Sequence, residues 1–411
     1  MNILILLIQC LVLTLGVTTG FAYLTLFERR VLARLQNRVG PNRAGPAGLL
    51  QPVADAIKLF FKEDIIPSAA DRWVYLIAPA LALIPAIIIW AVIPVGCWNI
   101  SGDYRACFDP ALSGELNNVM QVADMNVAVL YLLAVTSVGV YGITLAGWAS
   151  NNKYSMIGSI RSSAQLISYE LALGLAVLGA AMIAGTLSMQ EIVASQAGMW
   201  AIIPQFLGFV VFMVSATAEV VRAPFDLVEA EQELTGGYNT EYGSMKFALF
   251  FMAEYIKLIA VSSIAVTLFL GGWRFPGLET LGGMVAESAG PGMAAFVVGI
   301  VSLLSFLGKV AFFLFLAVWI RASWPRIRYD MLMDLGWKRL LPLGLVNVIM
   351  TAFVVVLIPN RWIHSMLLFL LGSAVLYVTV RYGQAARPRS SIEFAPREPL
   401  PSASVEQQLS S

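Results

Sequence analysis

The sequence predicts an all-α membrane protein with about nine transmembrane helices. Of its 411 residues, 59% are hydrophobic and 12% are charged, against roughly 25% charged residues in soluble domains. The mean hydropathy is +0.78. Apolar stretches of about 20 residues, the length that crosses a hydrocarbon layer of ~30 Å, recur along the chain. These observations together exclude an ordinary soluble domain.

Nine apolar stretches have this length or come close to it. They cover roughly residues 2–27, 73–95, 127–149, 163–185, 201–221, 247–271, 296–320, 340–358 and 362–382. The first has no basic n-region before it, so we interpret it as a retained span and not as a signal peptide. Residues 1–358 are expected to form the core, 359–382 an additional span, and the Pro- and Ser-rich residues 383–411 a disordered cytoplasmic tail.

The distribution of basic residues predicts the orientation of these spans. If the segment after the first span is cytoplasmic, 21 Lys and Arg residues lie on that side. Only Arg105, Arg274 and Arg361 lie on the other side. The positive-inside rule then predicts an N-terminus outside and a C-terminus in the cytoplasm.

Composition also limits the chemistry of the chain. A net charge of +1 gives no reason to expect a nucleic-acid partner. Three cysteines and one histidine are too few for an iron–sulfur cluster, a bis-histidine haem or a zinc site. Cys97 and Cys107 lie ten residues apart in an outer loop and are compatible with a disulfide or with free thiols.

A cluster of carboxylates follows the fifth span, in the loop 222–246. Its members are Asp226, Glu229, Glu231, Glu233 and Glu241, with Glu219 one turn earlier in the apolar run. Burial and adjacent like charges both drive protons back onto carboxylates. The cluster is therefore either a solvated acidic loop or a site that handles protons.

Two further carboxylates are predicted inside spans. Glu170 lies about two turns into the fourth span, and Glu254 lies in the sixth. An ionisable group there costs at least ~2.5 kcal/mol and usually serves function, although pairing with a buried cation is the structural alternative. Lys257 stands at i+3 from Glu254 and would neutralise it or tune its pKa. If the spans are neighbours, Glu170, Glu219 and Glu254 form a proton track from the loop toward the midplane.

An amphipathic helix is predicted over residues 47–63, after the first span. Its apolar face carries Leu49, Leu50, Val53, Ile57, Phe60 and Phe61. Such a helix suits the membrane interface, and the four charges between Asp55 and Glu63 oppose the alternative of a short span. On composition alone, the Arg-rich segment before it would anchor the first span at the headgroups.

Two long motifs carry a family resemblance. One is E-x-x-R-x-P-F-D-L-x-E-x-E-x-E-L-x-x-G-Y-x-x-E-Y, from Glu219 to Tyr242. The other is F-E-R-x-x-L-x-x-x-Q-x-R-x-G-P-N-x-x-G-x-x-G-x-x-Q-P-x-A-D-x-x-K-L, from Phe27 to Leu59. Both closely resemble the H-type (mitochondrial subunit 1) membrane subunit of respiratory complex I. The resemblance covers about residues 10–360, and the last span is similar to an additional helix of some bacterial members.

The resemblance implies a function in proton-translocating NADH:quinone oxidoreduction in a bacterial inner membrane. Quinone would be the substrate, while FMN and iron–sulfur clusters would belong to partner subunits. The implied proton-coupling residues are Glu170, Glu219, Asp226, Glu229, Glu231, Glu233 and Glu254. The implied quinone-chamber residues are Arg29, Arg30, Arg38, Asp55, Lys58, Arg222 and Phe225.

A basic segment follows the seventh span and also matches the family. Its charged residues Arg321, Arg326, Arg328 and Asp330 would either balance the acidic loop or only satisfy the positive-inside rule. Met331 departs from the family, in which many members carry Gln, so no polar role is expected at position 331.

Three other functions are compatible with part of the sequence. The homologous membrane subunit of an energy-converting hydrogenase or formate hydrogenlyase need not bind quinone, and the full match of both motifs favours the quinone enzyme. A stand-alone ion transporter is disfavoured because no strong internal repeat is found. A purely structural anchor leaves Glu170, Glu219 and Glu254 unexplained.

Overall fold

The computed structural model describes residues 3–98, 108, 120–227 and 236–385. The chain divides into two compact units, Met1–Ser373 and Ala374–Ser411. The described part of the second unit is the end of a helix, residues 374–385. Throughout the described residues the regular structure is helical, as the sequence predicts.

Long helices account for most of the expected spans. They are α1 (Ile3–Leu35), α3 (Arg72–Ile88, continued by η2, Ile89–Val92), α4 (Ala128–Ala149), α5 (Lys153–Ala184), α9 (Ser244–Phe269), α11 (Pro291–Ser323), α13 (Leu341–Leu357) and α14 (Arg361–Ala385). Shorter elements are η1 (Pro46–Gly48), α2 (Gln51–Phe61), α6 (Met189–Ser195), α7 (Phe206–Glu219), η4 (Gly237–Asn239), α10 (Leu278–Ala289), α12 (Tyr329–Leu335) and η5 (Gly336–Leu340). Among the described residues, eight helices are long and apolar enough to cross a membrane.

The fifth expected span differs from the other eight. Instead of a helix over 201–221, α7 has 14 residues, or about 21 Å at 1.5 Å per residue. Residues 201–205 form turns, and the buried Gln205 side chain bonds Thr351 and Asn347 of α13 at 2.8 Å each. At the other end, Val221 has a positive φ of 59°, which ends the helical path. A polar anchor at one end and a left-handed backbone at the other therefore bound this short helix.

Two helices extend beyond their predicted spans into segments expected to be loops. α1 continues to Leu35, so Glu28 is helical and buried rather than part of a headgroup segment. α5 begins at Lys153, where the Asn152 side chain accepts a hydrogen bond from the backbone N–H of Tyr154. The helix thus begins ten residues before the predicted span 163–185, because a capped helix start lies among the preceding polar residues.

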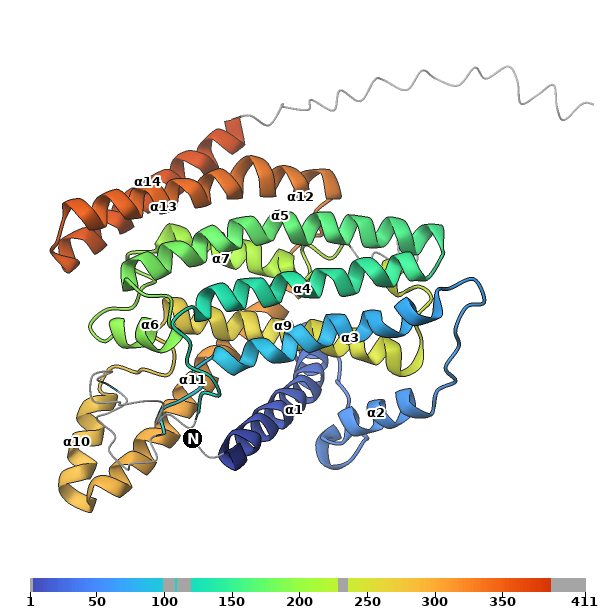
Figure 1. Ribbon diagram of the computed structural model, residues 1–411, viewed down its shortest axis with the longest axis horizontal. Coiled ribbons are helices and arrows are strands. Elements are labelled where there is room, and N and C mark those ends of the chain that lie inside the picture. The colour runs from blue at the N-terminus through green and yellow to red at the C-terminus, as the bar shows by residue number, and fades with distance from the viewer. Residues whose placement is uncertain (1–2, 99–107, 109–119, 228–235, 386–411) are drawn as a thin grey trace, which may run out of the picture. The chain divides into compact units, whose positions relative to one another are not determined.

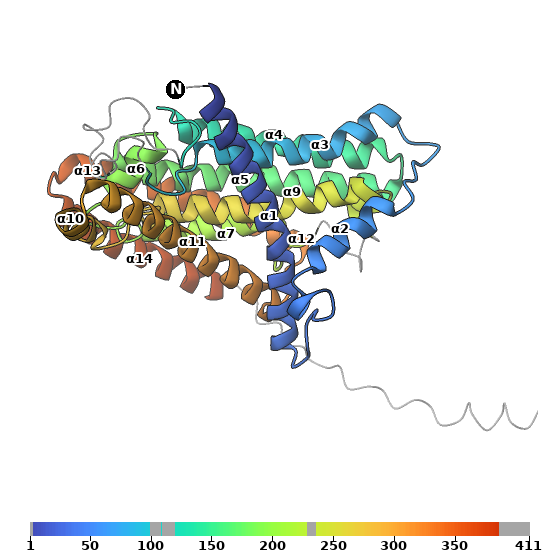
Figure 2. The same ribbon diagram turned by 90° about the horizontal axis from the view of Figure 1, so that it is seen from below.

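Helix α9 is the central element of the first unit. It contacts α1, α3, α7 and α11, and most of its residues are buried. α3, α4 and α5 lie side by side (Figure 1), and α7 and α13 pack on α5. Figure 2 shows α1 crossing this bundle steeply, in contact with α9 and α11. The arrangement brings the ends of α1, α7, α9 and α11 to one place.

The expected interfacial helix is present as α2, residues Gln51–Phe61. None of its residues is buried in the chain, and Phe60 and Phe61 are 68% and 80% exposed. Its apolar face is thus available to lipid or to a hydrophobic ligand.

Part of the acidic loop and of the outer loop lies outside the described residues. Glu229, Glu231 and Glu233 belong to this group, and so does Cys107. Cys97 is bonded in a disulfide, whereas Cys10 is a free thiol.

A close approach between α3 and α4 depends on one glycine. A Cβ atom at Gly142 would lie 2.6 Å from the backbone nitrogen of Ala82 and 2.9 Å from its Cα. Both atoms belong to the helix backbone, so a side chain there would force the two helices apart.

We therefore expect Gly142→Ala to destabilise the protein by about 1–3 kcal/mol, despite the better helix propensity of alanine. The matched control is Gly174→Ala in α5, where the added Cβ would have one ordinary contact, 3.9 Å from Leu133. Thermal unfolding of the purified protein in detergent measures both variants. Equal melting temperatures for the two would contradict the proposed close packing.

Candidate functional site

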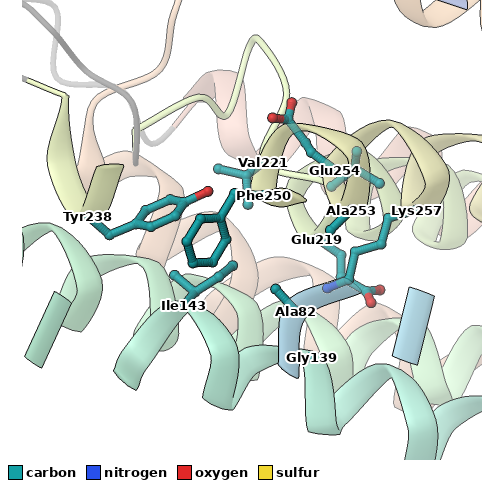
Figure 3. Close-up of a pocket in the computed structure, with 11 residues that line it drawn as sticks. Ala82, Gly139, Ile143, Glu219, Val221, Tyr238, Phe250, Ala253, Glu254 and Lys257 are labelled. Atoms are coloured by element: carbon teal, nitrogen blue, oxygen red, sulfur yellow. The ribbon is translucent and has the colours of Figure 1, made fainter. Parts of the chain in front are cut away.

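A charged cavity lies between α3, α4, α7 and α9. Its volume is about 40 Å³, room for about three water molecules at ~10–15 Å³ each. The charged lining residues are Glu219, Glu254 and Lys257, and most of the remaining wall is apolar. Figure 3 shows the Glu219 and Lys257 side chains meeting, whereas the Glu254 carboxylate points away from them. Such a site can hold water between a carboxylate and an ammonium group.

Glu219, the last residue of α7, is 6% exposed and faces the cavity. The Lys257 ammonium group from α9 points toward it (Figure 3). A Cβ at Gly139 of α4 would lie 3.1 Å from the Lys257 Nζ atom, so the glycine makes room for this group. Glu170 of α5 accepts a hydrogen bond from Ser137 and is close enough to act electrostatically on Glu219. The expected neighbourhood of these two glutamates is therefore present.

A buried ion-pair cluster lies beside the cavity. Arg222 is 7% exposed, and its Nη1 atom is 3.1 Å from both carboxylate oxygens of Glu28 in α1. Its Nε atom is in ion-pair contact with Glu254 of α9. Arg321 of α11 is in ion-pair contact with Glu28 from the other side. The Arg222 guanidinium also lies 4.0 Å from the centre of the Tyr255 ring.

This cluster has balanced charge, with two arginines and two glutamates. Balance matters because a buried charge without a partner is costly. The cluster also bears on the position of Lys257. Glu254 pairs with Arg222, so Lys257 is directed to Glu219 and not to its neighbour on the same helix.

The start of the acidic loop is fixed by α5. The buried Gln165 side chain donates hydrogen bonds to the carbonyl oxygens of Ala218 and Phe225, at 2.8 and 3.1 Å. Phe225 is 4% exposed and packs near Tyr169, with ring centres 6.0 Å apart. The Oδ1 atom of Asp226 is buried and has no hydrogen-bond partner among the described residues. Asp226 therefore stands at the edge of the described loop with one carboxylate oxygen that has no hydrogen-bond partner there.

The end of the acidic loop is fixed by α3 and α5. The Tyr75 hydroxyl donates to the carbonyl oxygen of Glu241 at 2.6 Å, and the Asn152 amide donates to its carboxylate at 2.7 Å. The rings of Tyr75 and Tyr242 stack at 4.1 Å. Burial raises the pKa of Tyr242, so its phenol stays protonated and donates to the Tyr75 carbonyl oxygen. Both ends of the loop are thus held by buried contacts.

The predicted quinone-chamber residues fall into two groups. Arg29 and Asp55 form an ion pair at 2.7 Å that links α1 to α2, with Lys58 3.9 Å from the same carboxylate. Arg30 donates to the carbonyl oxygen of Ala47. None of these residues lines the charged cavity.

The remaining chamber residues are distributed differently. Arg38 is exposed, Phe225 is buried away from the cavity lining, and Arg222 belongs to the ion-pair cluster.

The predicted charge-balancing residues also separate. Arg321 forms an ion pair with Glu28 of α1, whereas the sequence suggested the acidic loop as its partner. Arg328 and Asp330 pair at 3.1 Å but are 77% and 72% exposed, so the pair adds little. Arg326 is exposed. Contacts of these arginines with Glu229, Glu231 or Glu233 lie outside the described residues.

Sequence reasoning missed Glu28 and Tyr255. Glu28 was assigned to a headgroup segment because arginines follow it directly. The signal that could have identified it is the helical register, since an apolar run ending in F-E-R continues the helix by two more turns.

Comparisons with known proteins confirm the resemblance. A family model described as NADH dehydrogenase matches residues 8–352. The chain is 50% identical over 349 residues to an H-type subunit of the NADH-quinone oxidoreductase of Geobacter sulfurreducens, covering 84% of this chain and 94% of that protein. It is 47% identical over 380 residues to the H-type subunit of the same enzyme in Deinococcus radiodurans, covering 91% and 89%. The corresponding subunit of Protochlamydia amoebophila is 47% identical over 335 residues, covering 82% and 93%.

The ion-pair cluster leads to a stability prediction. Arg222→Met leaves Glu254 buried beside a neutral side chain, and we expect a loss of about 3–5 kcal/mol. Adding Glu254→Gln should recover part of the lost stability, because Glu254 is then no longer an unpaired charge and Glu28 still pairs with Arg321. The control is Arg328→Met at the exposed pair, with an expected loss below about 1 kcal/mol. Thermal unfolding in detergent measures all three, and an Arg222→Met loss as small as the control's would refute the structural role.

Proposed function

The chain belongs to the NADH dehydrogenase family, as an H-type subunit of NADH-quinone oxidoreductase, and on this premise we propose that it couples quinone reduction to proton translocation. The observation that supports this most directly is the charged cavity. Glu219 and Lys257 meet there, and the third charged residue, Glu254, is ion-paired to the arginine at the start of the acidic loop.

Proton transfer would run through Glu219. Its carboxyl group is buried, faces a cavity that has room for water and lies near a cation and a second carboxylate. Buried carboxyl groups with such neighbours are suited to accept and release protons near neutral pH. Glu170 on α5 would be the next carrier, since Glu170 and Glu219 act on each other electrostatically.

Coupling to the quinone would run through the acidic loop. Its first residue, Arg222, binds Glu254 of the cavity wall and Glu28 of α1 at the same time. A change in the charge of Asp226 or of the glutamates at positions 229, 231 and 233 would alter the field at Arg222. Because Arg222 and Glu254 are in contact, that change would reach the cavity, as coupling between two sites requires.

Quinone access would be formed by α1, α2 and the segment between them. The exposed apolar face of α2 suits an isoprenoid tail, and Arg29, Arg30, Arg38, Asp55 and Lys58 supply charge at its edge. Arg222 and Phe225 would complete the chamber on the side of the acidic loop. The quinone head would be reduced in a peripheral partner subunit, where FMN and iron–sulfur clusters belong.

The remaining proposals concern topology and assembly. The N-terminus would lie outside and the C-terminus in the cytoplasm of a bacterial inner membrane. Residues 1–358 would form the core, 359–382 an additional span and 383–411 a cytoplasmic tail. Arg321, Arg326, Arg328 and Asp330 would stand at the inner surface, facing other subunits of the complex.

The proton proposal predicts the effect of Glu219→Gln. In native membranes carrying this variant, we expect quinone-dependent NADH oxidation and proton pumping to fall together by at least about tenfold, while the complex still assembles. The reason is that an amide of the same shape cannot carry the proton. The control is Glu287→Gln, an exposed carboxylate on α10 outside the cavity. Unchanged rates in Glu219→Gln would assign the residue a structural role only.

The access proposal predicts the effect of Asp55→Asn. Loss of the exposed Arg29 pair is expected to raise the KM for quinone by up to about fivefold, corresponding to at most ~1 kcal/mol, with a smaller change in kcat. Asp334→Asn is the matched control, because it removes the carboxylate of another exposed ion pair, with Lys338 at 2.8 Å, that lies outside α1 and α2. Initial rates at varied quinone concentration separate KM from kcat. A change confined to kcat would place Asp55 in coupling and not in access.

A further inference from the structure

A second pocket lies at the other end of the spans, and we propose that it binds an anionic phosphate group of the kind that phospholipid headgroups carry. α9 begins beside the acidic loop and ends at Phe269. The chain after this end, with the segment that follows α6, surrounds a cavity of about 280 Å³. Its lining includes Trp200, Arg274, Phe275 and Glu279. No part of this pocket takes part in the function proposed above.

Arg274 is the centre of the argument. It is 8% exposed, and its Nη1 and Nη2 atoms donate to the carbonyl oxygens of Ala194 and Phe108 at 2.9 and 2.8 Å. Its Nε atom is buried and has no hydrogen-bond partner among the described residues. A guanidinium group holds its donors in a rigid plane that matches phosphate oxygens. The site therefore contains an ordered donor that the described chain does not use.

The charge around the pocket also calls for an anion. The neighbouring Lys309 ammonium group is held by the carbonyl oxygens of Leu270, Gly272 and Arg274, at 2.8, 2.9 and 2.6 Å. Within the described chain no carboxylate forms an ion pair with either cation. Burial lowers the pKa of Arg274, and the charge of Glu279 offsets only part of that effect. Glu279 lines the pocket but is exposed to solvent.

The start of α10 adds a third observation. Pro276, Gly277 and Glu279 line the pocket, and α10 begins at Leu278. This helix has 12 residues and no side-chain cap on its first amides. Free amides at a helix N-terminus favour anions. Guanidinium and helix terminus therefore face the same space.

The location identifies phosphate as the anion. The pocket lies just beyond the end of α9 at Phe269, a helix long and apolar enough to cross a membrane, so we expect it at the depth of lipid headgroups. Phe275 beside it is 57% exposed, so its ring is free to contact acyl chains or glycerol carbons. A phosphate group on an apolar carrier satisfies both the donors and this aromatic edge.

The test uses the intact complex in nanodiscs of phosphatidylcholine with phosphatidylglycerol as minor component. After a detergent wash, mass spectrometry measures the phosphatidylglycerol that stays bound. We expect Arg274→Gln to retain it about tenfold more weakly than the unmodified complex, as for loss of a charged hydrogen-bond donor. Glu279→Gln should retain it more strongly, because an exposed negative charge leaves the pocket. This second variant keeps the test decisive if Arg274→Gln fails to assemble.

The control is Arg361→Gln, which removes an exposed charge that lies outside this pocket. Equal losses in Arg361→Gln and Arg274→Gln, or no change in Arg274→Gln and Glu279→Gln, would overturn the proposal. Inorganic phosphate added during the wash distinguishes the two sources of the group. If phosphate releases the lipid, the pocket also binds free phosphate. If the lipid stays bound, the pocket is specific for the lipid headgroup. Both of these results support a phosphate site.

Discussion

The arrangement of the first unit depends on the buried contact of Arg222 with Glu28 and Glu254. These residues come from α1, from the chain after α7 and from α9. Moving charges out of water is costly, and only close pairing offsets the cost. The helices can therefore bury these groups only by converging at this point. The convergence sets the crossing of α1 over the bundle, the early end of α7 and the position where the acidic loop leaves the core.

This cluster also determines which charges remain for proton chemistry. Glu254 forms an ion pair with the Arg222 guanidinium group, which does not deprotonate in proteins. This pairing stabilises the negative charge of Glu254. Glu219 faces the Lys257 ammonium group across a cavity with room for water, and the proposed proton transfer rests on this second pair. The chain thus places an arginine-bound carboxylate and a carboxylate that faces a hydratable cavity side by side.

The sequence predicted features that depend on local apolar pattern, such as the spans. It did not predict features that depend on residues distant in the chain, such as the end of a helix or the partner of a buried charge. Eight spans were predicted because apolar length is a local property. The shortened α7 was missed because Gln205 binds residues more than 140 positions away. The i+3 spacing suggested Lys257 for Glu254, yet Arg222 occupies that carboxylate. Glu170 and Glu219 do lie on neighbouring helices, because α5 and α7 pack against each other although α6 and several turns separate them in sequence.

Buried cations have different partners at the two ends of the spans. Beside the acidic loop, Arg222 and Arg321 are neutralised by carboxylates of the same chain. At the far end, Arg274 and Lys309 are held by backbone carbonyl oxygens, which orient a cation without cancelling its charge. Carbonyl-held cations retain a field that attracts anions from outside the fold. The cations beside the acidic loop are thus neutralised by carboxylates of the described chain. The cations at the far end would be neutralised by the proposed phosphate group of a lipid.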